Sequence, residues 1–249
     1  MPRRLPDPYD AVVVTVGDGS VSETHLLAVL ARFPALEPLP DGGFVVAGRR
    51  SRTDEQHVQL FDAFGRGIAA FRVGDAIEHL QADEAGELWV EYFDEGIYGD
   101  APLSRPGLRC WTSTGEALWT FGPVPGAGEI SACYALNIHG RTAWAYPYAD
   151  FPLLEIHRDR SIRVRRTGVH GARGLAVHGD HLVFFGGHED ERDRIVECRL
   201  TAETVEPVAE GRLVLPDGSA LGRRQVVSRG PRLYVLGEAG LEWSVLDIS

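Results

Sequence analysis

Lysine is absent from this sequence of 249 residues, so all 25 basic residues are arginines. Since 36 residues are Asp or Glu, the formal net charge is −11 at neutral pH. A phosphodiester backbone is bound by a basic face, and an acidic chain offers at most a local basic patch, such as Arg163, Arg165 and Arg166. We therefore expect no nucleic-acid partner.

Cysteine is scarce, and long apolar runs are missing. Cys110, Cys133 and Cys198 lie far apart and form no Cys-x-x-Cys pair, which argues against a disulfide framework and a structural zinc site. No apolar run approaches the ~18 residues that would span a bilayer, and no apolar stretch follows Arg3 and Arg4 as it would in a secretory signal. We expect a cytoplasmic protein with reduced thiols and no membrane segment.

β-Prone segments are abundant, and some of them repeat. Residues 58–71 and 108–121 align without a gap at an offset of 50 positions, and a looser copy covers residues 153–164. Each copy has a β-prone stretch, a turn and a second β-prone stretch. This pattern predicts a β-hairpin in each copy.

A different hairpin precedes each of these copies, and its turn contains a glycine. Two hairpins in each period make a four-stranded antiparallel sheet, and such a sheet repeated along a chain is typical of a propeller blade. The sequence therefore predicts an all-β fold, a five-bladed β-propeller of four-stranded antiparallel blades. The five turn glycines have a mean spacing of 47 residues and are Gly42, Gly86, Gly140, Gly179 and Gly230.

The predicted propeller is a single domain over residues 1–249. The fifth repeat is short of one strand, and we expect an N-terminal strand from residues 11–32, either Ala11–Val16 or His25–Leu30, to close the last blade. Closure by both termini would remove open sheet edges. A short amphipathic helix is the alternative for Thr24–Arg32. The predicted blades cover approximately residues 33–75, 76–128, 129–170, 171–221 and 222–249.

One segment carries a resemblance to known repeats. In Glu78–Val90, a predicted inner strand ends in an acidic-x-x-Gly turn before Leu88-Trp89-Val90. This segment resembles NHL-type and gluconolactonase-type propeller repeats. With residues 91–99 and 133–137, it is also similar to a group of uncharacterised bacterial β-propeller proteins. The resemblance implies a fold and no particular activity, because propellers host many unrelated functions.

The start of each predicted inner strand is expected to lie at one rim of the ring, around the mouth of the central channel. Four of the five strand starts offer a polar or ionisable side chain, and loops on the same rim add others. These side chains form a candidate ligand site, although a water-filled mouth would also tolerate them. The predicted ligand-binding residues are Glu78, His79, Tyr134, Arg173, Arg224, Asp94, Tyr98, Tyr148 and His170.

These residue types favour binding over catalysis. The guanidinium groups of Arg173 and Arg224 suit a carboxylate or phosphate, and Tyr and Arg are common anchors at protein interfaces. The sequence therefore predicts a β-propeller binding protein that recognises a small acidic ligand or a protein partner at the channel mouth. We expect neither a nucleic-acid nor a membrane partner.

The alternative is an enzyme with its active site at the same mouth. Glu78 and His79 are the candidate residues for metal-free acid–base catalysis. The gluconolactonase resemblance implies a divalent metal that activates water, but Asn137 lies too far along its strand to be a ligand, and Arg173 and Arg224 would repel a cation. A His79, Cys133, His170 and His188 cluster has no short ligand spacing. We therefore expect no metal ligands and no cofactor, and a metal-dependent, lactonase-like hydrolase with a divalent metal at the channel mouth is the less favoured form of the enzyme alternative.

Overall fold

The computed structural model describes residues 7–17, 19–52, 55–214, 218, 225–237 and 243–249. These residues form strands and loops almost throughout, with a four-residue helix α1 (Asp94–Ile97) and a short 3-10 turn η1 (Glu189–Glu191). Among the described residues, no helix is both long and apolar enough to cross a membrane. The chain forms two compact units, called unit 1 (Met1–Phe121) and unit 2 (Gly122–Ser249). The prediction of an all-β fold is confirmed.

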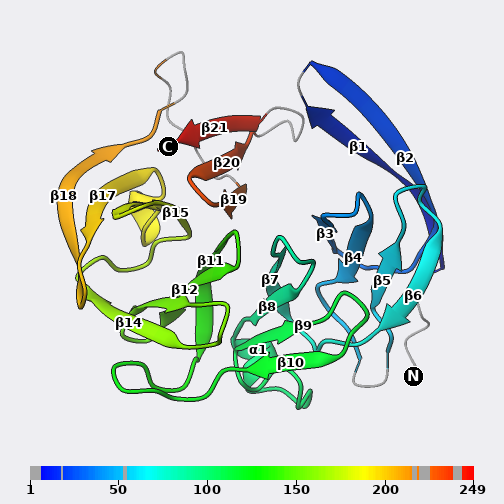
Figure 1. The fold of residues 1–249 in the computed structure, drawn as a ribbon, viewed down its shortest axis with the longest axis horizontal. Helices are drawn as coiled ribbons and strands as arrows, with labels where there is room; N and C mark the ends of the chain where they lie inside the picture. The colour runs from blue at the N-terminus through cyan, green and yellow to red at the C-terminus, as the bar shows by residue number, and fades with distance from the viewer. Residues whose placement is uncertain (1–6, 18, 53–54, 215–217, 219–224, 238–242) are drawn as a thin grey trace. The chain divides into compact units, whose positions relative to one another are not determined.

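Unit 1 contains two four-stranded antiparallel sheets whose strands follow one another in chain order. The gapless repeat at 58–71 and 108–121 is the outer hairpin of each sheet, as predicted (Figure 1). The first sheet consists of β3 (Pro34–Pro38), β4 (Phe44–Gly48), β5 (Val58–Phe61) and β6 (Gly67–Phe71). The second consists of β7 (Ile77–Ala82), β8 (Leu88–Tyr92), β9 (Leu108–Trp111) and β10 (Ala117–Thr120).

The acidic-x-x-Gly turn between β7 and β8 has a clear physical basis. The Asp83 carboxylate accepts backbone hydrogen bonds from Ala85 (2.9 Å) and Glu87 (3.0 Å), which closes a compact turn. Gly86 has φ +78°, a conformation that side chains with a Cβ rarely adopt. The turn delivers the chain into β8, all five residues of which are buried. The sequence pattern therefore encodes the entry into the most buried strand of this sheet.

A separate hairpin precedes these sheets. Strands β1 (Tyr9–Gly17) and β2 (Ser20–Val29) pair with each other in antiparallel register. Val13 and Leu26 face inward and pack against Phe44 and Phe61 of the first sheet. The helical alternative for Thr24–Arg32 is therefore wrong over the part that lies in β2.

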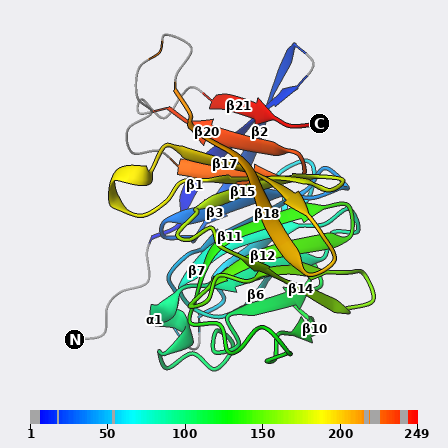
Figure 2. The same ribbon diagram turned by 90° about the vertical axis from the view of Figure 1, so that its left-hand side faces the viewer.

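In unit 2, the third and fourth predicted repeats share one eight-stranded sheet. Their outer strands β14 (Ile162–Thr167) and β18 (Thr204–Arg212) pair in parallel, and they lie side by side in Figure 2. The backbone N–H of Arg166 also donates to the carbonyl of Glu203 at 2.9 Å. The remaining strands are β11 (Ala132–His139), β12 (Thr142–Tyr148), β13 (Leu153–Ile156), β15 (Gly174–His178), β16 (His181–Phe185) and β17 (Arg194–Leu200).

The last sheet of unit 2 has three described strands, β19 (Gln225–Arg229), β20 (Arg232–Leu236) and β21 (Trp243–Asp247). The prediction of five four-stranded blades, the last closed by an N-terminal strand, is therefore wrong for the described residues. Two local pairings explain the difference. Strands β14 and β18 pair with each other through backbone hydrogen bonds, at Arg166 with Thr204 and at Thr167 with Val205. Strands β1 and β2 form their own antiparallel ladder.

Asn137 links three parts of unit 2. Its buried side-chain amide donates to the carbonyl oxygens of Leu175 and Gly230, both at 2.8 Å. The Gly230 N–H in turn donates to Asn137 Oδ1 at 2.6 Å. The Asn137 amide thus joins β11 to β15 and to the β19–β20 turn. Since these groups are buried, their hydrogen bonds cannot be replaced by water without rearrangement.

Replacing Asn137 by Ala should lower the free energy of unfolding by about 3 kcal/mol, because three buried hydrogen bonds are lost together. Urea unfolding monitored by circular dichroism measures this change. Gln225→Ala removes an exposed amide at the start of β19 and serves as the matched control. Equal stability of the two variants would contradict a structural role for the Asn137 amide.

His57 is the buried histidine of unit 1. It is 4% exposed, and its Nδ1 lies 3.1 Å from the carbonyl oxygen of Glu55. Its Nε2 is buried without a hydrogen-bond partner among the described residues. Burial lowers the pKa of His57 below the usual value for histidine, which keeps the ring neutral in the folded chain.

Unfolding should therefore become easier as the pH falls through the ordinary titration range of histidine. The unfolded chain binds a proton at His57 that the folded chain resists, so this stability is present above about pH 6.5 and is lost below it. Thermal unfolding between about pH 7 and pH 5 tests this sign. The pH dependence should be shallower in His57→Gln, and an identical slope in the two proteins would contradict it.

Candidate functional site

The side chains of Tyr134, Tyr148 and Arg173 meet at one end of the strands of the eight-stranded sheet. The Arg173 guanidinium carbon lies 3.9 Å from the centre of the Tyr134 ring. The Tyr148 ring is stacked on the Tyr134 ring, with 6.0 Å between centroids and 21° between planes. Three residues predicted from separate sequence positions are thus in contact.

Phe151 is the buried support of this cluster and is 3% exposed. Its ring centroid lies 5.0 Å from that of Tyr134 and 5.5 Å from that of Tyr148. The imidazoles of His170 and His188 lie 5.3 Å and 6.2 Å from it. We call the side chains that surround it the aromatic–arginine surface, which consists of Tyr134, Tyr148, His170, Arg173 and His188.

The strand order explains why these residues share an edge. Tyr134 lies near the start of β11, and Tyr148 is the last residue of β12. His170 and Arg173 precede β15, and His188 follows β16. In an antiparallel sheet, the start of one strand and the end of the next lie at the same edge. The structure therefore brings Tyr134, Tyr148, His170 and Arg173 together inside unit 2, and their role in ligand binding stays a prediction.

The surface combines exposed positive charge with a fixed aromatic layer. Arg173, His170 and His188 are exposed, Tyr134 is half-buried, and Tyr148 is 45% exposed. Stacking on Tyr134 restrains the guanidinium, but its N–H groups can still donate to an incoming anion. The arrangement suits recognition of a carboxylate next to an apolar group.

The neighbouring Tyr146 is a structural residue. Its hydroxyl donates to the carbonyl oxygen of Val169 at 2.6 Å, and burial raises its pKa well above the usual value. Its ring packs on Phe151 at 5.1 Å between centroids. The Tyr146 hydroxyl therefore positions the segment that leads to His170 and is not available to a ligand.

Glu78 and His79 lie in unit 1, where β7 begins, and both are half-buried. The backbone register places His79 directly opposite Glu91, whose side chain is fully buried. Arg49 donates from its guanidinium to the carbonyl oxygens of Ile77 and Glu78. Sequence reasoning missed both Arg49 and Glu91, although a carboxylate within the apolar run of β8 is an available signal. The acid–base role of Glu78 and His79 stays a prediction.

Asp94 and Tyr98 also belong to unit 1, in and directly after α1, and both are exposed. The segment is held close to the start of β7, since the Phe93 N–H donates to the carbonyl of Ala76 at 3.2 Å. The structure thus brings Glu78, His79, Asp94 and Tyr98 to one end of the second sheet of unit 1. Arg224 lies outside the described residues.

The three cysteines, Cys110, Cys133 and Cys198, are free and buried. Burial raises the pKa of the Cys198 thiol to about 12, which makes it a poor nucleophile. Among the residues that the structure describes, no three His, Cys, Asp or Glu side chains are grouped so that they could hold a metal ion.

Sequence comparisons leave the family of the chain open. No family model matches it, and no curated protein matches it. The resemblance to NHL-type and gluconolactonase-type repeats in particular therefore stays a prediction.

Solved structures do resemble the chain. The streptogramin B lyase structure is 16% identical over 97% of this chain and 74% of its own, with a TM-score of 0.51. A chain of the nidogen/laminin complex is 10% identical over 97% of this chain and 87% of its own, with a TM-score of 0.57. A functionally unknown protein from Desulfotomaculum acetoxidans DSM 771 is 10% identical over 96% of this chain and 76% of its own, with a TM-score of 0.59. At such identities the likeness shows the fold alone, which is all-β and propeller-like.

Two substitutions should separate the support of the aromatic–arginine surface from its exposed part. Phe151→Ala should lower the free energy of unfolding by about 3–4 kcal/mol, because it removes a buried ring that several others contact. Arg173→Gln should cost less than about 1 kcal/mol, because one exposed cation–π contact is lost. Urea denaturation measures both, and a Phe151→Ala variant as stable as Arg173→Gln would contradict this assignment.

Proposed function

We propose that this chain is a propeller-type binding protein that recognises a protein partner through the aromatic–arginine surface. The observation that carries the proposal is the Arg173 guanidinium, whose carbon lies 3.9 Å from the centre of the Tyr134 ring, on which the Tyr148 ring is stacked. The partner presents a carboxylate to Arg173 and an apolar side chain to the tyrosine rings.

The composition of the surface supports a protein partner. Tyr and Arg supply most binding energy at protein interfaces, because they combine large contact areas with polar groups. Tyr134 and Tyr148 are restrained by Phe151, so ordering them on binding costs little conformational entropy. Arg173 provides positive charge that attracts an acidic partner.

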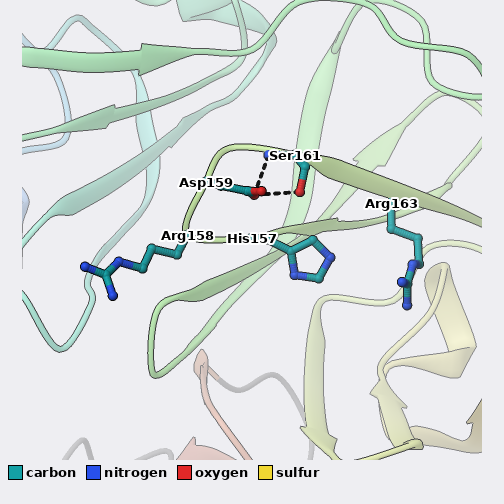
Figure 3. A pocket seen from close by; sticks show the side chains of 5 residues that line it. All are labelled: His157, Arg158, Asp159, Ser161 and Arg163. Atoms are coloured by element: carbon teal, nitrogen blue, oxygen red, sulfur yellow. Dashed lines mark hydrogen bonds between the residues drawn. The ribbon is translucent and has the colours of Figure 1, made fainter.

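The shape of the surface favours a protein over a small molecule. Drug-sized ligands usually occupy concave sites that enclose most of their surface. Two hollows of unit 2, one bordered by His157 and Arg163 (Figure 3) and the other by Glu191 and Arg212, are lined by none of the residues of the aromatic–arginine surface. An exposed cluster of this kind is typical of contact with an opposing surface.

The names of two similar structures are consistent with this proposal. They are those of the mitotic checkpoint complex, at 8% identity and a TM-score of 0.59, and of the nidogen/laminin complex. Both of these structures are protein complexes by name. Since identity is low, they support the suitability of the fold for protein binding and identify no partner.

The test is affinity capture from cells that naturally express the chain, followed by calorimetry with the purified partner. The wild type and Arg173→Glu serve as parallel baits. Charge reversal at the centre of the surface should weaken binding at least about tenfold, since a hot-spot contact of 1.4 kcal/mol or more is lost.

Arg105→Glu is the matched control, because Arg105 is exposed in unit 1 and makes no ion pair among the described residues. It should bind like the wild type. A partner that binds Arg173→Glu and the wild type equally would overturn the proposal. Saturable binding of succinate that depends on Arg173, with no captured protein, would instead assign the surface to a small acidic ligand.

A further inference from the structure

The outer edge of strand β1 is open. This nine-residue strand of unit 1 pairs with β2 on one side. On the other side, the backbone groups of residues 11–16 have no hydrogen-bond partner among the residues that the structure describes. Figure 1 shows β1 and β2 as one long hairpin. Because a sheet edge presents a row of backbone donors and acceptors, a further strand can pair with β1 there.

The outer edge of β2 is, by contrast, held by the first sheet of unit 1. The Gln59 side chain of β5 accepts a hydrogen bond from the Leu30 N–H at 2.7 Å and donates one to the carbonyl oxygen of Ala28 at 3.0 Å. In the β5–β6 turn, Gly65 lies so close to the carbonyl oxygen of His25 that no Cβ fits between them. The hairpin is therefore fixed through β2, and β1 is the strand with the open edge.

The side chains on one face of β1 are exposed, apolar and β-branched. Val12, Val14 and Val16 are 48%, 55% and 75% exposed, and they alternate with the buried Val13. Val21 of β2 lies directly opposite Val16 and is 66% exposed. β-Branched side chains favour an extended backbone and pack well against those of a neighbouring strand. This row of valines can therefore pack against the side chains of an added strand.

Residues that prevent edge pairing are missing from β1. The strand contains no proline, lysine or arginine, and its one charged residue, Asp10, lies near one end and accepts a backbone hydrogen bond from β2. Strand β18 differs, because the part that follows its pairing with β14 at Val205 contains Glu206, Pro207 and Glu210. Charged residues and proline protect sheet edges from pairing with another chain. Strand β18 has this protection, and β1 does not.

We propose that the β1 edge is a self-association surface, at which a second copy of the chain adds its own β1 in antiparallel orientation. The charges decide the orientation. Parallel pairing places the two Asp10 carboxylates side by side, whereas antiparallel pairing about the middle of the strand places them at opposite ends. At about 3.4 Å per residue they are then roughly 20 Å apart, which exceeds the Debye length of about 8 Å at physiological ionic strength.

A second copy matches this edge in both shape and charge. In a two-fold symmetric contact the same surface serves both partners, and the valine row of one β1 packs on the valine row of the other. The chain has a net charge of −11, so contact between extensive surfaces of two copies is opposed by repulsion. Residues 11–16 are uncharged and form a strip along which two acidic chains can approach each other.

This inference does not rest on the proposed function. Strand β1 belongs to unit 1, and the aromatic–arginine surface belongs to unit 2. The two surfaces share no residue, so either proposal can fail alone.

The test is sedimentation velocity of the full chain over a range of concentrations at physiological ionic strength. The sedimentation coefficient should rise from that of a monomer towards that of a dimer. Val14→Lys should raise the dissociation constant of the dimer at least about tenfold, because a lysine on the edge strand opposes pairing. Val208→Lys is the matched control, since Val208 is 65% exposed on β18, and it should dimerise like the wild type.

Hydrogen exchange locates the contact. The amide groups of residues 11–16 should exchange more slowly as the concentration of the wild type rises, and this protection should be lost in Val14→Lys. Circular dichroism checks that the variant is folded, and Val12→Lys repeats the test at the neighbouring exposed position. A chain that stays monomeric up to about 1 mM, a dimer that both lysine variants leave intact, or protection of β1 that is independent of concentration would overturn the proposal.

Discussion

Antiparallel pairing between consecutive strands is the constraint on which the core and both candidate sites depend. It places the start of β11 beside the end of β12, and the start of β15 beside the end of β16, and the packing of β15 against β11 brings these two pairs together. The same rule sends the β13–β14 turn to the opposite end.

In the aromatic–arginine surface, the buried residue Phe151 holds the exposed side chains in position. Phe151 has φ +53°, a strained conformation for a residue with a Cβ, and it is held there by tightly packed rings. Its ring fixes Tyr134 and Tyr148 from below. The exposed parts of both tyrosines are therefore presented in one orientation, and Arg173 is stacked over the first. The packing of Phe151 in the core therefore preorganises the exposed surface.

Charge is distributed unevenly in unit 2. The chain is acidic overall. Among the described residues, Arg165 pairs with one carboxylate, that of Glu155, and Arg158 pairs with none. An unpaired exposed arginine costs little stability, because its charge is solvated.

The sequence by itself determined the all-β class, the hairpins at 58–71 and 108–121, and the edge on which Tyr134, Tyr148, His170 and Arg173 meet. These follow from local chemistry, since alternating β-prone stretches and turn glycines specify hairpins, and antiparallel order then fixes which strand ends coincide. Tertiary structure alone decided that β14 pairs with β18, that β1 pairs with β2, and that Phe151 and His188 complete the surface. Edge pairing and side-chain packing join residues of distant sequence position, and no local pattern encodes which edges or rings will meet.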